Sequence, residues 1–221
     1  MIEPGHYRLA IFADLHVHER PACSSPGIRE NSHIDGQIET VQELVYEARK
    51  RKIPHCVMLG DLLHTRDTIT ILEHDAAAEI LYLLNAGFER VWLICGNHDF
   101  GFLLDGKTYL ERLTSSLPNV TLVREASILQ ASPGHTLEIA CLPYSADQCG
   151  ALERLATLAK SSHRHTHPPG RPLLLGHAAM IGGWLDTGVK STSGIPPHLQ
   201  RLIVDTWQYG LFGDFHTAQS L

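Results

Sequence analysis

One stretch of the chain places three polar side chains directly after a buried strand. The apolar run Val91–Cys95 predicts such a strand, and Gly96 ends it abruptly. Asn97, His98 and Asp99 follow at once. Open α/β sheets bind their ligands at the carboxyl ends of their strands, so this is where functional groups are expected. The amide oxygen suits a hard cation, the imidazole can transfer protons near neutral pH, and the carboxylate can hold that imidazole in orientation.

The same arrangement, an apolar run that ends in a polar turn, recurs along the chain. The run Arg8–Ala13 leads into Asp14, His16 and His18, which share one face if this segment is extended. Later runs lead into a Gly-Asp, a Gly-His and a second Gly-Asp pair. Together these turns supply Asp14, His16, Asp61, Asn97, His177, Asp214 and His216.

Helical and loop patterns separate these runs. The stripe Ile38, Val41, Leu44, Val45 and Ala48 predicts a helix, and a second helix closes at Gly87. Alternation of strand and helix in this half favours parallel pairing. Further helices are predicted at Gly106–Leu117 and Ala151–Lys160. Strands of a second group are predicted at Val120–Val123 and Thr136–Leu142, and a short strand at Leu173–Leu175. The remaining stretches Pro21–Gly36, Ser161–Arg171 and Gly182–Gly194 are predicted to be loops.

Length and composition narrow the class of protein. The 221 residues favour one domain over 1–221, and the formal charge of −6 counts against tight, sequence-independent DNA binding by this chain alone. Five cysteines without paired spacing indicate a reducing compartment, with Cys56 and Cys95 buried. With no leader pattern and no apolar run of membrane length, we expect a cytoplasmic protein without a membrane partner.

The seven donors indicate a particular kind of metal centre. They are oxygen and nitrogen ligands without a thiolate, and they are too many for one structural zinc ion. Such a set suits two divalent cations about 3.5–4 Å apart that share a bridging carboxylate and clamp a phosphate. The mixture of oxygen and nitrogen donors favours Mn²⁺, with Mg²⁺, Fe and Zn²⁺ as alternatives.

These motifs together resemble those of the calcineurin-like metallophosphoesterases. The matching segments are DLH at 14–16, GDLLH at 60–64, GNHD at 96–99, GH at 176–177 and GDFH at 213–216. The resemblance implies an α/β fold, a four-layer αββα sandwich of two mixed sheets flanked by helices. It also implies two metal ions in one centre.

The resemblance assigns a role to each donor. Asp14, His16 and His216 would hold the first metal ion, and Asp61 would bridge the two ions. The second ion would be held by Asn97, His177 and Asp214. His98 would contact the phosphate together with Asn97 and protonate the leaving oxygen, and Asp99 would orient His98.

One subgroup fits better than the others. His64 in GDLLH, and the segment DTWQYGLFGDFH at 205–216, resemble the SbcD-type DNA exonuclease subunits and their phage relatives. The resemblance implies a DNA nuclease in which a metal-bridging hydroxide attacks the phosphodiester, His64 lies near the nucleolytic site, and an SMC-like SbcC-type ATPase is the partner. Asp214 stands where the pattern has histidine. No capping region follows His216, so we expect single strands or ends as DNA substrates.

Three other readings compete with a DNA nuclease. The same fold could act on a nucleotide, a cyclic nucleotide or a phosphoprotein, since motifs fix chemistry better than substrate. The segment ADLHVH at 13–18 resembles the opening of the polymerase-and-histidinol-phosphatase family, but that family leaves GNHD and GDFH unexplained. A non-catalytic binding module on the same scaffold would not need the full ligand set and His98.

Overall fold

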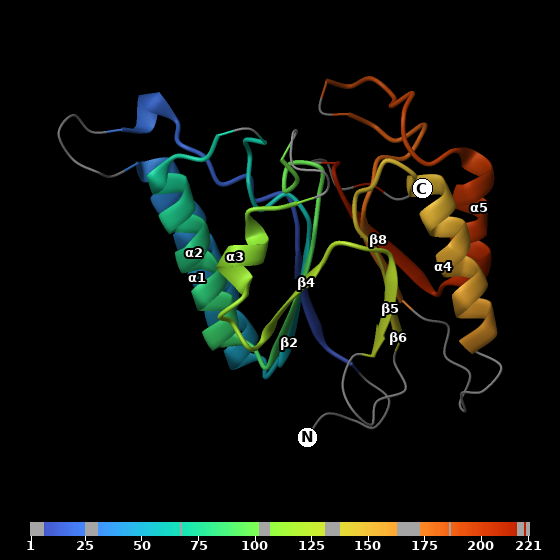
Figure 1. Ribbon diagram of the computed structural model, residues 1–221, viewed down its shortest axis with the longest axis horizontal. Helices are drawn as coiled ribbons and strands as arrows, with labels where there is room; N and C mark the ends of the chain where they lie inside the picture. Colours follow the sequence, from blue (N-terminus) through green and yellow to red (C-terminus); the bar gives the residue numbers. More distant parts are fainter. Residues whose placement is uncertain are drawn as a thin grey trace. The chain divides into compact units, whose positions relative to one another are not determined.

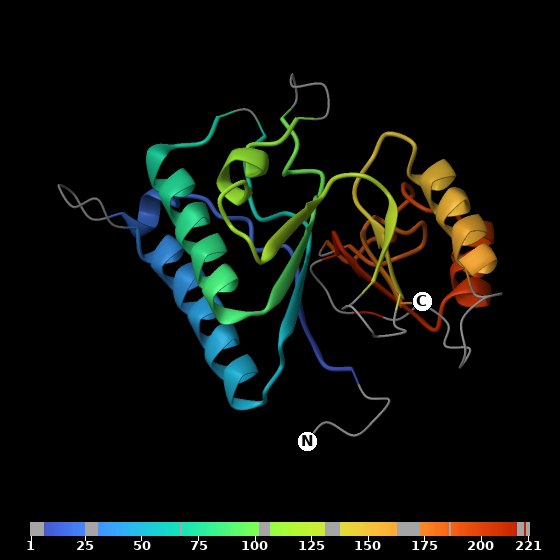
Figure 2. The same ribbon diagram turned by 60° about the horizontal axis from the view of Figure 1, so that its bottom comes forward.

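A computed structural model describes the chain over residues 7–24, 31–66, 68–101, 107–130, 138–162, 173–185, 187–215 and 219. The chain forms two compact units, each with its own sheet and helices (Figures 1 and 2). The first comprises Met1–Leu93 and His98–Leu122, and the second comprises Ile94–Asn97 and Val123–Leu221. The single domain expected from length stays a prediction.

The first sheet contains four strands in the order β1-β2-β3-β4. Its strands are β1 (Leu9–Phe12), β2 (His55–Leu59), β3 (Arg90–Ile94) and β4 (Val120–Val123). β1 and β2 are parallel, with Ile11 opposite Val57, as the strand–helix alternation predicted. Every residue of β2 is buried, which explains why its sequence is a continuous apolar run rather than an alternating one.

Two long helices lie side by side against this sheet (Figure 1). They are α1 (Ser32–Lys50) and α2 (Ile71–Gly87). The predicted loop Pro21–Gly36 was too long, because α1 already begins at Ser32. The side chain of Asn31 accepts the His33 N–H at 3.2 Å and so caps the helix. Thr70 and Glu73 form a capping box at the start of α2, which ends at Gly87 as predicted.

The prediction that Val120–Val123 belongs to a second group of strands was wrong. β4 lies at the edge of the first sheet, beside β3. Between them the chain forms the short helix α3 (Leu110–Thr114) and returns at Asn119, whose main-chain oxygen accepts the Val91 N–H at 2.7 Å. The Asn119 amide also donates to the main-chain oxygens of Asn85 and Phe88, which fixes this return to the end of α2.

The second unit contains a mixed sheet with the order β5-β6-β7-β8. Its strands are β5 (Ser127–Gln130), β6 (Glu138–Leu142), β7 (Leu173–His177) and β8 (Tyr209–Gly213). β5 is antiparallel to β6, while β6, β7 and β8 are mutually parallel. The sequence analysis missed β5, whose residues are half-buried or exposed and show no apolar period.

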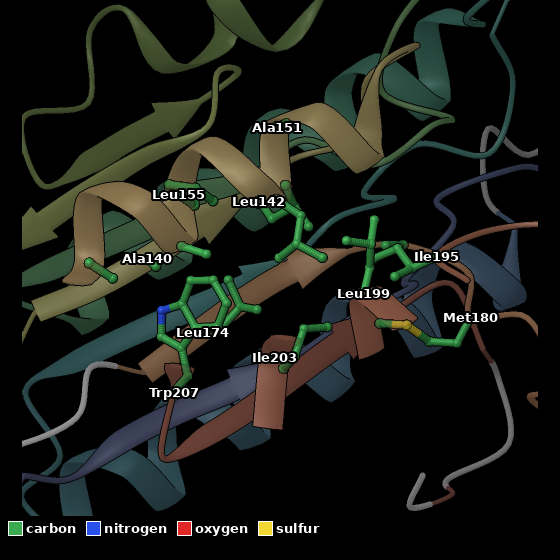
Figure 3. Packing of buried hydrophobic residues seen from close by; sticks show 14 residues of the cluster. Ala140, Leu142, Ala151, Leu155, Leu174, Met180, Ile195, Leu199, Ile203 and Trp207 are labelled. Carbon is green, nitrogen blue, oxygen red and sulfur yellow. The ribbon is translucent and has the colours of Figure 1, made fainter. Parts of the chain in front are cut away.

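Two helices cover this sheet and complete its core. α4 (Gln148–Ser162) and α5 (Pro197–Thr206) bury small and branched residues against β6 and β7. In Figure 3, Leu174, Ile203 and Trp207 pack together, with Ala151 and Leu155 of α4 above them. The short 3-10 helix η1 (Pro21–Cys23) lies in the first unit.

The two sheets flanked by helices confirm the predicted α/β class. Cys56 and Cys95 are buried, as predicted. Most of the histidine-rich loop predicted at Ser161–Arg171 lies outside the described residues, since α4 extends to Ser162. Within the described ranges, none of the helices combines the length and apolar content that crossing a bilayer requires.

Candidate metal centre

Backbone strain in the described chain concentrates at predicted metal ligands. Five non-glycine residues there have positive φ, and four of them are Asp14 (54°), His16 (48°), Asp61 (55°) and Asp214 (96°). The left-handed region costs an L-residue roughly 1–2 kcal/mol, although Asp, Asn and His tolerate it better than most. Strain of this kind gathers at functional sites, because the surrounding structure must hold it in place.

In the first unit, the turns after β1 and β2 run side by side. The main-chain N–H groups of Asp14, His16 and Val17 donate to the oxygens of Gly60, Asp61 and Leu62 at 2.8–3.0 Å. We expected Asp14, His16 and His18 to share one face because their segment would be extended. The segment is not extended in the structure. The positive φ values at Asp14 and His16 turn the chain sharply after Phe12.

A buried glutamine that the sequence analysis did not single out supports this turn. Gln37 of α1 donates through Nε2 to the main-chain oxygens of Leu15 and His16, at 2.6 and 3.0 Å. The one feature of the sequence that could have identified Gln37 is its position three residues after Ile34, which places a polar residue on the buried side of an amphipathic helix. Gln37 therefore fixes the strained segment that carries Asp14 and His16.

Asp99 holds the turn that carries Asp61. Its side chain is 1% exposed, and its carboxylate accepts the N–H groups of Asp61 (2.9 Å) and Leu63 (3.2 Å). The hydrogen bonds from these two main-chain donors to the buried carboxylate are charge-assisted and therefore strong. Asp99 thus stabilises the left-handed backbone of Asp61 from a position 38 residues further along the chain.

His98 is held from two sides. Its main-chain N–H donates to Asp61 Oδ1 at 2.8 Å, and its ring Nδ1 makes a short hydrogen bond to the main-chain oxygen of His64. A carbonyl can only accept, so Nδ1 carries the proton and Nε2 is the atom that can exchange a proton with a substrate. The His98 ring thus contacts the main chain of His64, and its orientation by Asp99 stays a prediction.

Three imidazoles gather around Asp61. His16 Nε2 lies 3.7 Å from Asp61 Oδ2, and the rings of His64 and His98 lie edge-on to that of His16 at centroid distances of 5.3 and 4.9 Å. One ring nitrogen of each of these histidines lies within 4.8 Å of the others, close enough to serve one ion. Burial lowers the pKa of His64, as do electrostatic interactions with His18, His98 and Arg20, although Glu73 raises it. The neutral form of His64, which can act as a ligand or acceptor, is therefore favoured.

In the second unit, Asn97, His177 and Asp214 meet at one point. His177 is fully buried at the end of β7, and its Nε2 lies 2.8 Å from Asn97 Oδ1 and 3.6 Å from Asp214 Oδ1. Its main-chain oxygen accepts the Gln148 amide at 2.8 Å. Gly176 precedes it because a Cβ there would lie 2.7 Å from the Leu142 carbonyl oxygen.

Both groups of residues fit divalent cations. Neighbouring ligands of an octahedral ion with bonds of about 2.1 Å lie about 3 Å apart, close to the separations around His177 and between His16 and Asp61. Carboxylate, imidazole and amide donors suit hard or borderline ions. Of the predicted ligands, the structure groups His16 with Asp61 and Asn97 with His177 and Asp214, with Asp14 hydrogen-bonded to the Asp61 turn. His216 lies outside the described residues.

The fold and these donors define a metal-dependent hydrolase of phosphate esters. The family model of the calcineurin-like phosphoesterases matches residues 7–152, more than half of the chain. The chain belongs to the calcineurin-like phosphoesterase family, whose members typically bind two divalent metal ions.

Solved structures share the fold at low sequence identity. A dimetal phosphatase from Danio rerio is 14% identical, with a TM-score of 0.51 over 90% of this chain and 76% of that one. The nuclease MPE from Pseudomonas putida is also 14% identical, with a TM-score of 0.37 over 96% of this chain and 78% of that one. No curated protein matches the chain. At such identities the likeness to the phosphatase concerns the fold alone.

The contacts of Asp99 generate a first prediction. Asp99→Asn replaces one carboxylate oxygen by an NH₂ group that faces main-chain donors, so the Asp61 turn loses a charge-assisted bond. We expect the free energy of unfolding to fall by about 2–3 kcal/mol in thermal or urea denaturation. We also expect weaker Mn²⁺ binding by calorimetry. Asp205→Asn, on the exposed side of α5, is the matched control. Unchanged stability and Mn²⁺ affinity in Asp99→Asn would contradict this role.

Proposed function

We propose that this chain is a phosphodiesterase that hydrolyses DNA, a nuclease of the SbcD type. The observation that carries the proposal is the bond between the His98 ring and the main-chain oxygen of His64. His64 belongs to the GDLLH segment through which the chain resembles those nucleases. In the structure the main chain of this segment contacts the ring of the residue proposed as the acid, and the His64 ring packs beside that ring.

The proposed ligands hold two divalent ions, with Mn²⁺ favoured and Mg²⁺, Fe or Zn²⁺ as alternatives. Asp14, His16 and His216 would hold the first ion, Asp61 would serve both ions, and Asn97, His177 and Asp214 would hold the second. Two ions bound in this way supply Lewis-acid stabilisation of the phosphate and a more acidic water. In support, Asn97 Oδ1 lies 2.8 Å from His177 Nε2, and the main-chain N–H of the next residue, His98, donates to Asp61 Oδ1.

The chain's own groups supply binding and proton transfer. Asn97 and His98 bind the phosphate, and His98 Nε2 delivers a proton to the leaving oxygen. The His64 carbonyl keeps the proton on Nδ1 throughout, so the ring cannot rotate without losing that bond. His64 supports this step through its main chain, and its ring packs beside that of His98 at a centroid distance of 5.6 Å.

Charge decides which DNA the chain accepts unaided. The chain has 24 acidic and 18 basic residues, and its net charge of −6 disfavours binding of DNA phosphates away from the metal ions. Asp214 adds a third anionic ligand where the family pattern has histidine, which makes the centre less positive and favours harder ions. We therefore propose single strands or ends as substrates, an SMC-like SbcC-type ATPase as the partner for duplex DNA, and action in the cytoplasm.

The role of His98 generates a second prediction. His98→Asn keeps the main-chain N–H that binds Asp61 but removes the proton donor, so we expect two bound metal ions and a turnover about 10²–10⁴-fold lower. Metal analysis and DNA cleavage assays in Mn²⁺ measure the two effects. His74→Asn, on the exposed side of α2, is the control and should behave as the wild type. Loss of a metal ion from His98→Asn would mean that His98 is a ligand.

A third prediction tests the substrate. In Mn²⁺, we expect the chain to cleave a single-stranded oligonucleotide and bis(p-nitrophenyl) phosphate, and to cleave a blunt duplex much more slowly. EDTA should abolish all three activities. Hydrolysis of a cyclic nucleotide or a phosphopeptide without cleavage of any DNA would move the chain to another substrate class of its family. Rapid, unaided digestion of blunt duplex DNA would contradict the need for a partner.

A further inference from the structure

A row of four imidazoles begins at His98 and extends to residues without a role in the proposed reaction. His64 stacks near-parallel on His98 at 5.6 Å, His18 stacks on His64 at 4.2 Å, and His33 meets His18 edge-on at 4.8 Å. All four belong to the first unit. The two outer rings, His18 and His33, lie beside the site but are not among its proposed ligands.

His18 holds an arginine at the outer part of this row. Its Nδ1 donates to the main-chain oxygen of His16 at 2.6 Å, so its Nε2 carries a lone pair. The Nε–H of Arg20 points to that Nε2 at 3.4 Å, at the long end of hydrogen-bond distance. The terminal nitrogens of the guanidinium take no part in this contact.

Arg20 is exposed, and within the described ranges its guanidinium forms no ion pair with a carboxylate. Its main chain is nevertheless fixed, because the Asn31 amide donates to the Arg20 oxygen at 2.9 Å. The preceding Glu19 N–H donates to Glu73. The two nearby carboxylates are already engaged: Glu73 accepts the N–H groups of Glu19 and Thr70, and Glu19 accepts the Thr70 hydroxyl. Arg20 is thus a positioned cation that can take an anionic partner.

The chemistry of this cluster favours an anion over a metal ion or a base. A guanidinium beside the rings repels a further metal ion. The stacking of His64 on both His18 and His98 covers ring faces on which a nucleobase would have to stack. A phosphate supplies acceptors for the terminal N–H groups of Arg20, and Arg is well suited to binding it.

We propose that Arg20, held by His18, forms a subsite for a second phosphate of the substrate, next to the phosphate that is cleaved. This inference rests on the proposed function, because the row starts at the residue proposed to protonate the leaving oxygen. It specifies the substrate class further: a polynucleotide with a phosphate on the neighbouring nucleotide, rather than a small diester. Arg20 binds the phosphate directly, and His18 orients the guanidinium.

Calorimetry on the Mg²⁺-loaded protein tests this subsite without relying on turnover. The ligands are a dinucleotide with a methylphosphonate linkage, which is not cleaved, and the same dinucleotide with an added 5′- or 3′-phosphate. In the wild type we expect the added phosphate, at one end, to tighten binding about tenfold, the lower range for a charged hydrogen bond at an exposed site. Arg20→Ala should lose this gain, and His18→Ala should lose most of it.

Two further variants separate a specific subsite from general charge. Arg201→Ala, an exposed arginine of α5, removes the same charge and should keep the tenfold gain. Arg20→Lys keeps the charge but loses the contact to His18, so it should retain only part of the gain. The subsite is refuted if neither added phosphate tightens binding to the wild type, or if Arg20→Ala keeps the gain. Failure of the proposed function shows separately, as absence of DNA cleavage by the wild type.

Discussion

The candidate centre depends on the hydrogen bonds between the Asp99 carboxylate and the N–H groups of Asp61 and Leu63. These bonds hold the Asp61 turn in a left-handed conformation that an L-residue would otherwise leave. The Asp14–Val17 segment is hydrogen-bonded along that same turn, and His98 donates its N–H to the Asp61 side chain. One buried carboxylate thereby fixes the position of both turns and of the proposed acid, and the fold's contribution to function is this preorganisation.

The site also shows how neighbouring residues of one segment take different tasks. Within Gly96–Asp99, the amide of Asn97 faces His177 in the second unit, His98 lies with Asp61 and His64 in the first, and Asp99 supports the Asp61 turn. Every position after the glycine thus carries a separate function. The imidazole row beyond His98 extends the same unit toward Arg20, where a positioned cation lies outside the proposed metal ligands.

Most strands, and the polar turns in which they end, could be predicted from the sequence, because buried strands such as His55–Leu59 are continuous apolar runs. Features that depend on distant contacts could not. β4 joins the first sheet through Asn119 and the end of α2, and β5 lacks an apolar pattern. The start of α1 depends on the Asn31 cap inside a stretch with loop composition. The contact of the Asp99 carboxylate with a turn 38 residues away could not be predicted from its position beside His98.

The central proposal is that the predicted ligands bind two divalent ions as one dinuclear centre. Electron paramagnetic resonance of the metal-free protein titrated with Mn²⁺ tests this most directly, because two Mn²⁺ ions about 3.5–4 Å apart that share a bridging carboxylate are magnetically coupled. The account predicts that the isolated six-line signal is replaced, as the second equivalent binds, by the spectrum of a coupled pair. Two equivalents bound with additive, uncoupled signals, or a single equivalent at saturation, would contradict it.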